Sequence, residues 1–384
     1  MNRVDFSLPD DVKLLQATVR DYVRDRLLPI SMQIERDDAV PEDVLDEMKE
    51  LGLFSIPLPE EYGGGGFSEL GYCVAMEELG RANAAISNII GGHCSLSGTA
   101  IALGGSEDLK RRYLPAMSTG EKLGAFALTE PNAGSDAAHI QTIAVRKGES
   151  FLLTGSKLWV SNGPIADLYT VFAVTDRARG TKGITAFVVD RETPGLKIGR
   201  VDEKMGLRGS KTSEVFFEEA VVPAENVIGE EGHGFRVAMQ TLDGGRIALG
   251  ASCVGQAQAA LDMAKMYSRQ RIQFGRPISS NQAIQWMLAD SEVEIHAARM
   301  MVYHAAWKID SGQRASHEAA IVKVYCTEMA NRVIDRALQI HGGMGYMKEF
   351  DIERMYRDAR ILRIYEGTSE VQRMIIADDL LASG

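Results

Sequence analysis

The feature that most constrains the fold of this chain is a double change of hydrophobic period. From residue 9 to about 103, apolar residues recur every three or four positions, which is the period of a helix. Between about 125 and 232, short runs of β-branched and aromatic residues are separated by clusters of Gly, Asp, Thr and Asn, which is typical of strands and turns. From about 234 the helical period returns. This pattern therefore predicts three blocks in the order helical, β and helical.

The helical blocks divide into shorter segments at prolines and turn-rich stretches. In the first block we expect two helices within residues 9–56, joined across Pro29 to Pro41, and further helices from Glu69 to about Gly80 and from Ala84 to Leu103. In the last block we expect helices at roughly 234–271, 281–311, 315–341, 348–364 and 369–382, enough for a four-helix bundle.

These segments predict an α+β multidomain fold. We expect an N-terminal helical domain (1–124), a middle β domain of sandwich or barrel type (125–232) and a C-terminal helical bundle (233–384). A Rossmann fold is disfavoured, because it needs strands that alternate with helices. The glycine-rich HGGMGY at 341–346 follows a helical pattern, so it is interpreted as an interhelical loop and not as a dinucleotide fingerprint.

Composition excludes several classes of function. A net charge of −11 argues against a broad nucleic-acid surface. No run approaches 18 uncharged apolar residues and no secretory signal is apparent, so no membrane span is expected. The four cysteines stand singly, which favours reduced thiols and a cytoplasmic protein. The seven histidines are dispersed, so no metal site is expected.

The stretch RIYEGTSEVQ at 363–372 places the carboxylate of Glu366 where one helix is expected to end and the next to begin. Ser369 is interpreted as the N-cap of the last helix, with Gln372 completing a capping box. This leaves unexplained why Glu366 stands at the break between two helices.

Two segments of the β block admit both a structural and a functional interpretation. FALTEPNAGSD at 126–136 contains turn formers, but its polar side chains and backbone N–H groups also suit a flat heterocycle or a phosphate. In KLWVSNG at 157–163, Trp159 and Ser161 lie two positions apart and so share one face of a strand. Packing alone accounts for such a tryptophan, although the pair also suits an aromatic cofactor with a polar edge.

Arginines in the last block are similarly ambiguous. Arg269 and Arg271 close a helix ahead of Gly275 and Pro277, where cations favour the helix dipole but where an arginine fork also suits a pyrophosphate. Arg246 stands in an apolar helical run, so it needs a partner charge or a substrate if it is buried.

Taken together, these motifs resemble the acyl-CoA dehydrogenase family of flavoproteins over essentially the whole chain. The resemblance rests on segments in the family's order: PEEYGG, LTEPNAGSD, WVSNG, GLRGSKTSEV, LDGGR, RIQFGRPI, QIHGGMGY and YRDARILRIYEGTSEVQ. It implies FAD bound between the middle and last domains and oxidation of a saturated acyl-CoA to the trans-2-enoyl-CoA. It also implies electron transfer to an electron-transfer flavoprotein and a homotetramer built as a dimer of dimers.

The resemblance assigns roles to individual residues. Glu366 matches the catalytic base, and its backbone N–H is expected to bind the thioester oxygen together with a flavin hydroxyl. Family members that place the base before the LDxxR arginine have a carboxylate where this chain has Gly245, which cannot serve. The expected FAD contacts are Phe126, Leu128, Thr129, Gly134, Ser135, Trp159, Ser161, Arg271, Phe274, Gln282, Gln339, Gly342, Gly343, Thr368 and Glu370, several of them on a neighbouring subunit's FAD. The expected substrate contacts are Ser135, Asp243, Arg246, Tyr365 and Gly367.

Substrate choice stays more open. Ser87 occupies the place where glutaryl-CoA dehydrogenases carry an arginine, which disfavours a dicarboxylic acyl group. Small residues around it are compatible with a short, branched or cyclic acyl chain, but they also suit helix packing. Flavin monooxygenases, desulfinases and enoyl-CoA reductases on the same fold are alternatives, and a non-enzymatic scaffold is a third interpretation.

Overall fold

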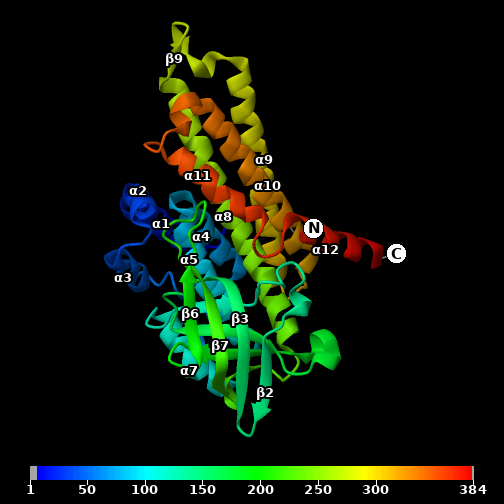
Figure 1. The fold of residues 1–384 in the computed structure, drawn as a ribbon. Coiled ribbons are helices and arrows are strands. Elements are labelled where there is room, and N and C mark those ends of the chain that lie inside the picture. Colours follow the sequence, from blue (N-terminus) through cyan, green and yellow to red (C-terminus); the bar gives the residue numbers. More distant parts are fainter. Residues whose placement is uncertain (1–6, 383–384) are drawn as a thin grey trace.

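The computed structural model describes residues 7–382, and its helices and strands follow the predicted order. Helices fill the chain from 10 to 118, strands dominate from 124 to 228, and helices return from 234 to 382. Figure 1 shows the sheet at one end of the molecule, the long C-terminal helices at the other, and the N-terminal helices beside them. The predicted fold class is confirmed.

The first helical segment differs from the prediction at Pro29. Helix α1 (Asp10–Tyr22) runs through a π-helical turn (Val23–Leu27) directly into α2 (Leu28–Asp37), so the expected break at Pro29 is wrong. A proline lacks the N–H donor and crowds the carbonyl four residues before it. The wider turn just ahead of Pro29 changes the hydrogen-bonding pattern where this clash would occur. The chain breaks instead at Asp38, whose φ is 51°.

The remaining N-terminal helices are short. They are α3 (Glu42–Glu50), α4 (Glu69–Ala82), α5 (Ala84–Gly91), α6 (Thr99–Gly104) and α7 (Glu107–Ser118), with a π-helical segment at Gly92–Gly98. Helix α7 was not predicted, although its start carries a clear signal. The Ser106 side chain accepts a hydrogen bond from the Leu109 N–H at 3.2 Å, and two acidic residues follow in the first turn.

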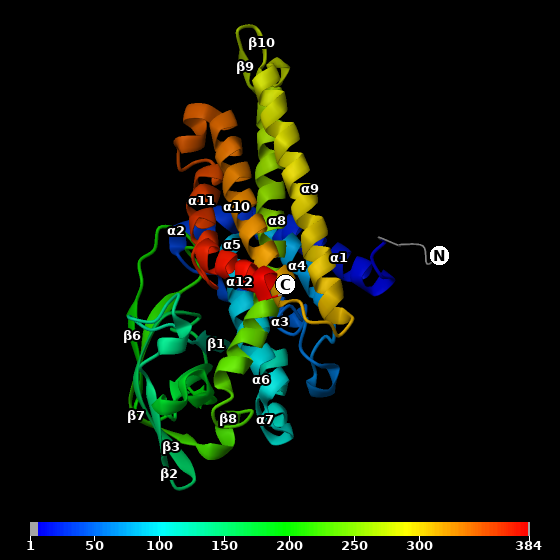
Figure 2. The same ribbon diagram turned by 90° about the vertical axis from the view of Figure 1, so that its right-hand side faces the viewer.

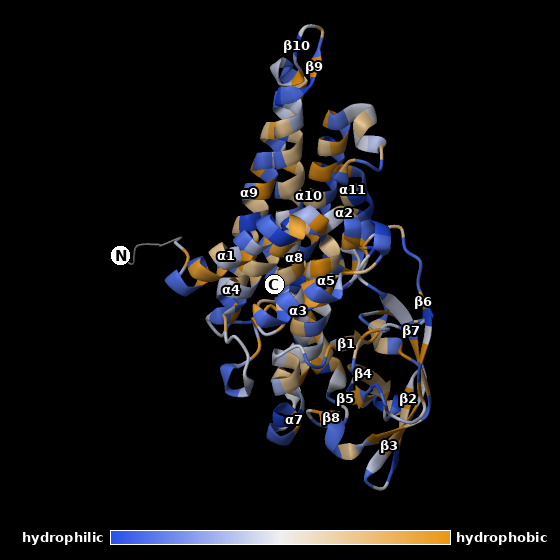
Figure 3. Cartoon of the chain, turned by 90° about the vertical axis from the view of Figure 1, so that its left-hand side faces the viewer, coloured by the Kyte–Doolittle hydropathy of each residue, from blue (hydrophilic) through white to orange (hydrophobic). Residues whose placement is uncertain are grey.

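The middle block forms one folded sheet. Its strands are β1 (Gly124–Ala127), β2 (Ile143–Lys147), β3 (Ser150–Ser161), β4 (Leu168–Val174), β5 (Ile184–Asp190), β6 (Leu196–Val201), β7 (Thr212–Pro223) and β8 (Val227–Ile228). They pair in the order β6-β7-β3-β2-β4-β5-β8, and β1 pairs β4 in parallel. Buried side chains of β4 and β5 pack against those of β3 and β7, which makes the block a sandwich. In Figure 3 these strands carry orange segments, which mark hydrophobic residues.

The C-terminal block contains the longest helices. They are α8 (Gly234–Gln270), α9 (Gln282–Asp310), α10 (Ser316–His341), α11 (Asp351–Ala359) and α12 (Ser369–Ala382). The short hairpin β9 (Ile272–Gln273) and β10 (Arg276–Pro277) joins α8 to α9 at the far tip of the molecule, which Figure 2 shows well away from the sheet. The HGGMGY segment connects α10 to α11 as a short 3₁₀ turn, so its interpretation as an interhelical connection is confirmed.

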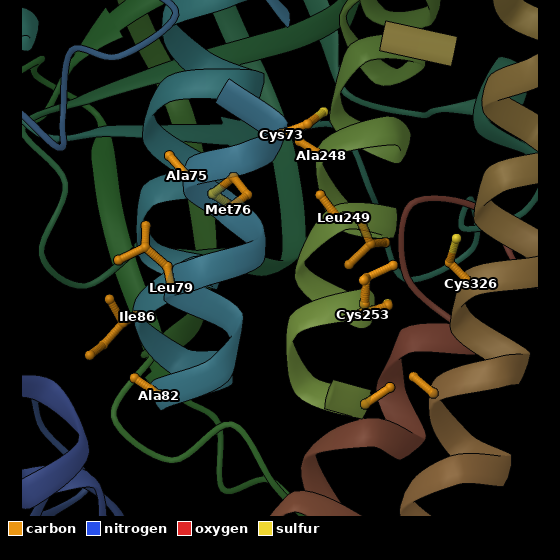
Figure 4. Packing of buried hydrophobic residues seen from close by; sticks show 14 of the residues in the cluster. Cys73, Ala75, Met76, Leu79, Ala82, Ile86, Ala248, Leu249, Cys253 and Cys326 are labelled. Atoms are coloured by element: carbon orange, nitrogen blue, oxygen red, sulfur yellow. The ribbon is translucent and has the colours of Figure 1, made fainter. Parts of the chain in front are cut away.

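Helices α4 and α8 form the contact that joins the N-terminal and C-terminal blocks. A Cβ atom at Gly255 would lie 1.9 Å from the Glu77 carbonyl oxygen, and one at Gly80 would lie 2.5 Å from that of Ser252. Only glycine permits such an approach, so the two helices touch backbone to backbone. Figure 4 shows the side chains of Cys73 on α4 and Ala248 on α8 next to each other between the two helices. No helix among residues 7–382 has the length and apolar composition that a membrane span requires.

Candidate active site

A cavity of about 360 Å³ lies where the three blocks meet. One wall comes from α4, α5 and the π-helical segment, a second from β1, β3 and the loop between β1 and β2, and a third from α8 and the turn before α12. The predicted residues that line it are Phe126, Leu128, Thr129, Gly134, Ser135, Trp159, Ser161, Arg246, Tyr365, Glu366 and Gly367. Tertiary structure thus brings together residues that are up to 241 positions apart, from Phe126 to Gly367.

Glu366 projects its carboxylate into this cavity from a strained turn. Its φ is 54°, a left-handed conformation that non-glycine residues rarely adopt, and Gly367 follows with a φ of 90°. The Glu366 Oε2 atom is buried and has no hydrogen-bond donor among the described residues. Burial raises the pKa of Glu366 to about 7, against the opposing effect of the Arg246 and Lys323 charges. A carboxylate that titrates near neutrality in a cavity is suited to accepting a proton.

The turn that carries Glu366 is held by side chains, and here the predicted capping box is wrong. The Thr368 hydroxyl accepts the Val371 N–H at 3.2 Å, so Thr368, not Ser369, caps α12. Gln372 is fully buried and donates its amide to the carbonyl oxygens of Glu366 at 3.1 Å and Gly367 at 3.4 Å. The Gln372 amide is thus engaged by the two carbonyl oxygens of the turn, so it does not form the capping-box hydrogen bond at the start of α12. Gln372 thereby fixes the strained backbone.

Arg246 supports the same turn from α8. Its side chain is 6% exposed, and its Nε donates to the Glu366 carbonyl oxygen at 3.2 Å. Its Nη1 binds the Asp243 Oδ1 at 3.1 Å, which confirms that the buried arginine has a partner charge. Asp243 also accepts a hydrogen bond from Ser316 and does not itself line the cavity.

Gly245 lies directly beneath the carboxylate. A Cβ atom there would be 3.2 Å from Glu366 Oε2 and 2.9 Å from Leu96 Cδ2. Because Gly245 has no side chain, it leaves room for the Glu366 side chain. A carboxylate at position 245 would enter the same cavity.

The cavity wall formed by β3 carries Trp159 and Ser161, and the prediction that they share a face is confirmed. Both line the cavity, while Val160 between them points into the sheet core. Trp159 has a φ of 55° and sits at a register shift between Lys157 and Val160, which is a β-bulge. The indole is 62% exposed. The bulge turns a flat aromatic surface towards the cavity.

A buried ion pair that sequence analysis missed holds the neighbouring loop. Lys157 Nζ donates to Glu130 Oε1 at 2.7 Å and to the Leu128 carbonyl oxygen at 3.2 Å, and the Leu158 N–H donates to the Thr129 carbonyl oxygen at 2.9 Å. Burial lowers the pKa of Lys157 to about 8 despite its partner. Strict alternation puts Lys157 on the face of Trp159, and the bulge reverses this. A charged residue within a strand is the signal that could have found it.

The floor of the cavity is closed by hydroxyl groups. Ser87 Oγ and Ser252 Oγ lie 2.9 Å apart, and Gln256 Nε2 donates to Ser252 at 3.2 Å. Ser87 also reaches the Ala84 carbonyl oxygen at 3.1 Å, so the chain of hydrogen bonds is satisfied within the protein. Met76 of α4 adds an apolar side chain to the lining beside them.

The other predicted site residues lie away from this cavity within one chain. Phe274, with a φ of 54°, is fully exposed on the β9–β10 hairpin at the tip of the molecule. Gly342 and Gly343 have open space around them at the end of α10. Thr368 caps α12 and Glu370 is exposed. None of the following residues lines the cavity around Glu366: Arg271, Phe274, Gln282, Gln339, Gly342, Gly343, Thr368 and Glu370.

Comparison with known proteins gives matches over nearly the whole chain. Family models described as the N-terminal, middle and C-terminal domains of acyl-CoA dehydrogenase match residues 9–121, 125–220 and 232–381. The short-chain specific acyl-CoA dehydrogenase of Clostridium acetobutylicum is 42% identical, over 97% of this chain and 99% of its own.

Two further proteins are similar to the same extent. The caffeyl-CoA reductase-Etf complex subunit CarC of Acetobacterium woodii is 42% identical over 96% of this chain and 98% of its own. The solved structure of butyryl-CoA dehydrogenase from Megasphaera elsdenii superimposes with a TM-score of 0.96 at 42% identity, covering 98% of this chain and 100% of that one. With three matching domain models and these relatives, the chain belongs to the acyl-CoA dehydrogenase family.

Proposed function

We propose that this protein catalyses FAD-dependent α,β-dehydrogenation of an acyl-CoA thioester to the trans-2-enoyl-CoA, with Glu366 as the base. The observation that carries the proposal is the Glu366 carboxylate itself. Its Oε2 atom is buried and has no hydrogen-bond donor among the described residues, its pKa is raised to about 7, and it lines the same cavity as Trp159 and Ser161. A carboxylate so placed is suited to accept a proton from a bound substrate.

The residues around the cavity fit a flavin ring. Trp159 offers an exposed aromatic face, Phe126 and Leu128 offer apolar edges, and a Cβ atom at Gly134 would meet nothing within 4 Å. Ser161 and Thr129 supply polar groups at the same wall. FAD, the cofactor of this family, supplies the hydride acceptor when it is bound. Lys157 and Glu130 would keep the 128–130 loop in place against it.

The protein's own groups perform the proton transfer. Glu366 removes the α-proton, because desolvation makes its carboxylate basic near pH 7. The Glu366 backbone N–H is proposed to bind the thioester oxygen as negative charge develops. Gly367 has no side chain to block the approach, and Arg246 and Gln372 hold the Glu366 carbonyl oxygen so that the turn keeps its strained shape. Tyr365 closes the cavity beside the carboxylate. Asp243 and Ser135 are proposed to lie along the CoA chain.

The residues far from Glu366 are proposed to serve another subunit. Arg271 at the end of α8, Phe274 on the hairpin and Gln282 at the start of α9 would bind the pyrophosphate and adenosine half of a neighbouring FAD. Gln339, Gly342 and Gly343 at the end of α10 would contribute to the same site. Thr368 and Glu370 would contact FAD near the turn.

An exposed apolar stripe on α9 supports self-association into the proposed homotetramer. Its members recur every seven residues, so they share one face of the helix. They are Trp286, Val293, Met300 and Trp307, with exposed fractions of 60%, 68%, 37% and 53%. Large apolar side chains grouped on one helix face are typical of a protein interface.

The cavity floor supports a short acyl chain. The hydrogen-bonded Ser87 and Ser252 pair closes the space between α5 and α8. Among the described residues that line the cavity, the one Lys or Arg side chain is Arg246, which is already paired with Asp243. We propose branched and cyclic acyl groups as further substrates of the same cavity. An electron-transfer flavoprotein is the proposed electron partner, since the relative CarC is named as part of a reductase-Etf complex. Because that relative is a reductase, reduction of an enoyl-CoA is the second candidate for the physiological direction.

Anaerobic bleaching of the bound flavin tests the proposal. We expect purified protein to be yellow and to lose its flavin absorbance on addition of butyryl-, isobutyryl- or 2-methylbutyryl-CoA. A colourless protein would support the scaffold interpretation. Yellow protein that no acyl-CoA bleaches, including hexanoyl-, octanoyl- and cyclohexanecarbonyl-CoA, would favour the monooxygenase or desulfinase alternatives.

A further inference from the structure

A second buried charge close to Glu366 has no assigned role. Lys323 lies on α10 and is fully buried, with an exposed fraction of 0%. Its Nζ atom has no hydrogen-bond partner among the described residues. The other fully buried lysine, Lys157, has a carboxylate at 2.7 Å and a carbonyl oxygen at 3.2 Å. Lys323 is therefore not part of a structural ion pair of that kind, and an unpaired buried ammonium is costly unless something compensates its charge.

Close packing of two helices places Lys323 beside the active site. A Cβ atom at Gly250 of α8 would lie 2.4 Å from Val322 Cγ1 and 3.5 Å from Cys326 Sγ of α10. The glycine lets the two helices approach closely at the residues that flank Lys323. Figure 4 shows Cys253 of α8 and Cys326 of α10 on these adjacent helices. This approach leaves Lys323 close enough for its charge to interact with Arg246 and Cys253 of α8.

Four titratable or charged side chains interact with the Lys323 charge. Arg246 and Cys253 face it from α8, Glu366 from the turn, and Glu370 from α12. Arg246 is already paired with Asp243 at 3.1 Å, the Cys253 thiol is neutral because burial raises its pKa, and Glu370 is exposed to solvent. The Glu366 carboxylate is the remaining buried anion, and the cations that act on it are Arg246 and Lys323.

We propose that Lys323 is a positioning residue of this site, whose buried ammonium partly compensates the negative charge of Glu366 and so favours the ionised form that accepts the substrate's α-proton. The inference rests on the proposed function, in which Glu366 is the base. The pairing works through charge rather than contact, which leaves Glu366 Oε2 free of donors that would compete with the substrate proton.

A Lys323→Met variant tests this assignment. Methionine has a similar length and no charge, so the Glu366 pKa should rise by about one unit or more, as expected for loss of a nearby opposite charge. The carboxyl group of Glu366 can be titrated directly by infrared difference spectroscopy, with Glu366→Gln identifying its signal. The melting temperature should not fall, because the variant removes a buried ammonium without a hydrogen-bond acceptor. Lys323→Gln provides a second variant if the methionine protein does not fold.

Flavin reduction should separate an electrostatic role from a merely structural one. In Lys323→Met the rate should be about tenfold lower than in the wild type at pH values below the wild-type midpoint, and should reach the wild-type plateau at higher pH. Lys308→Met is the matched control, because Lys308 pairs with Glu318 at 2.7 Å and should leave the Glu366 midpoint unchanged.

Two results would overturn the inference: an unchanged Glu366 midpoint in both Lys323 variants, or a rate that is lower by the same factor at every pH. Failure of the proposed function is a separate outcome. If acyl-CoA does not bleach the wild-type flavin, the base role is wrong, but the infrared titration still decides whether Lys323 shifts Glu366.

Discussion

Replacing Glu366 with Gln should abolish flavin reduction and at the same time stabilise the protein above neutral pH. The side chain keeps its shape, but the amide cannot accept a proton, so we expect reduction by acyl-CoA to fall by several orders of magnitude. FAD and acyl-CoA should still bind. The stability effect follows from the raised pKa of Glu366, which means that the folded protein holds a proton that the unfolded chain releases.

The sign and size of the stability effect follow from the two pKa values. A carboxyl whose pKa rises from 4.5 to about 7 on folding destabilises the folded state increasingly as pH rises between these values. At about 1.4 kcal/mol per pKa unit, the loss reaches roughly 3 kcal/mol above pH 7. The variant lacks this term. Its melting temperature relative to the wild type should therefore increase from pH 5 to about pH 7 and remain constant above.

Calorimetry at pH 5, 6, 7 and 8, with stopped-flow reduction under argon, measures both effects on the same protein. A Glu366→Asp variant is the matched control, since it retains an ionisable group on a shorter side chain. The reasoning is refuted if Glu366→Gln reduces its flavin at a near wild-type rate. It is equally refuted if the difference in melting temperature between wild type and variant is the same at pH 5 and pH 8.

Other predictions follow from the same contacts. The wild-type rate of flavin reduction should rise about tenfold per pH unit below pH 7 and level off above it, since the ionised fraction of Glu366 rises in that way; a rate independent of pH between 5 and 8 in stopped-flow would contradict the assigned base. Lys157→Met leaves Glu130 buried and unpaired, so it should destabilise the protein by about 3–5 kcal/mol and accelerate FAD loss on dialysis, followed by flavin absorbance. Ser87→Leu should fill the cavity floor and raise KM for hexanoyl-CoA more than for butyryl-CoA, whereas equal increases would place the acyl chain elsewhere. Changing Trp286 and Trp307 to Asp together should dissociate the oligomer in sedimentation experiments, and an unchanged sedimentation coefficient would exclude this face of α9.

Several local features could not be predicted because they depend on neighbours distant in the chain. Pro29 predicts a helix break by itself, yet the π-helical turn before it lets the helix continue to Asp37. Ser369 and Gln372 match a capping box by spacing, but Gln372 is drawn to the Glu366 and Gly367 carbonyl oxygens instead. Lys157 changes faces because of a bulge, and a bulge depends on the register of the paired strand.

The sequence by itself determined the order of helical and β blocks, the family and the catalytic candidate. The hydrophobic period is a property of neighbouring residues, and each of the motifs around Trp159, Arg246 and Glu366 is one short continuous segment of the chain. What only the tertiary structure decided is the electrostatic environment of Glu366. Its raised pKa depends on burial by three blocks, and on Arg246 and Lys323, which lie 120 and 43 positions before it. Desolvation and charge act through space, so no spacing along the chain encodes them.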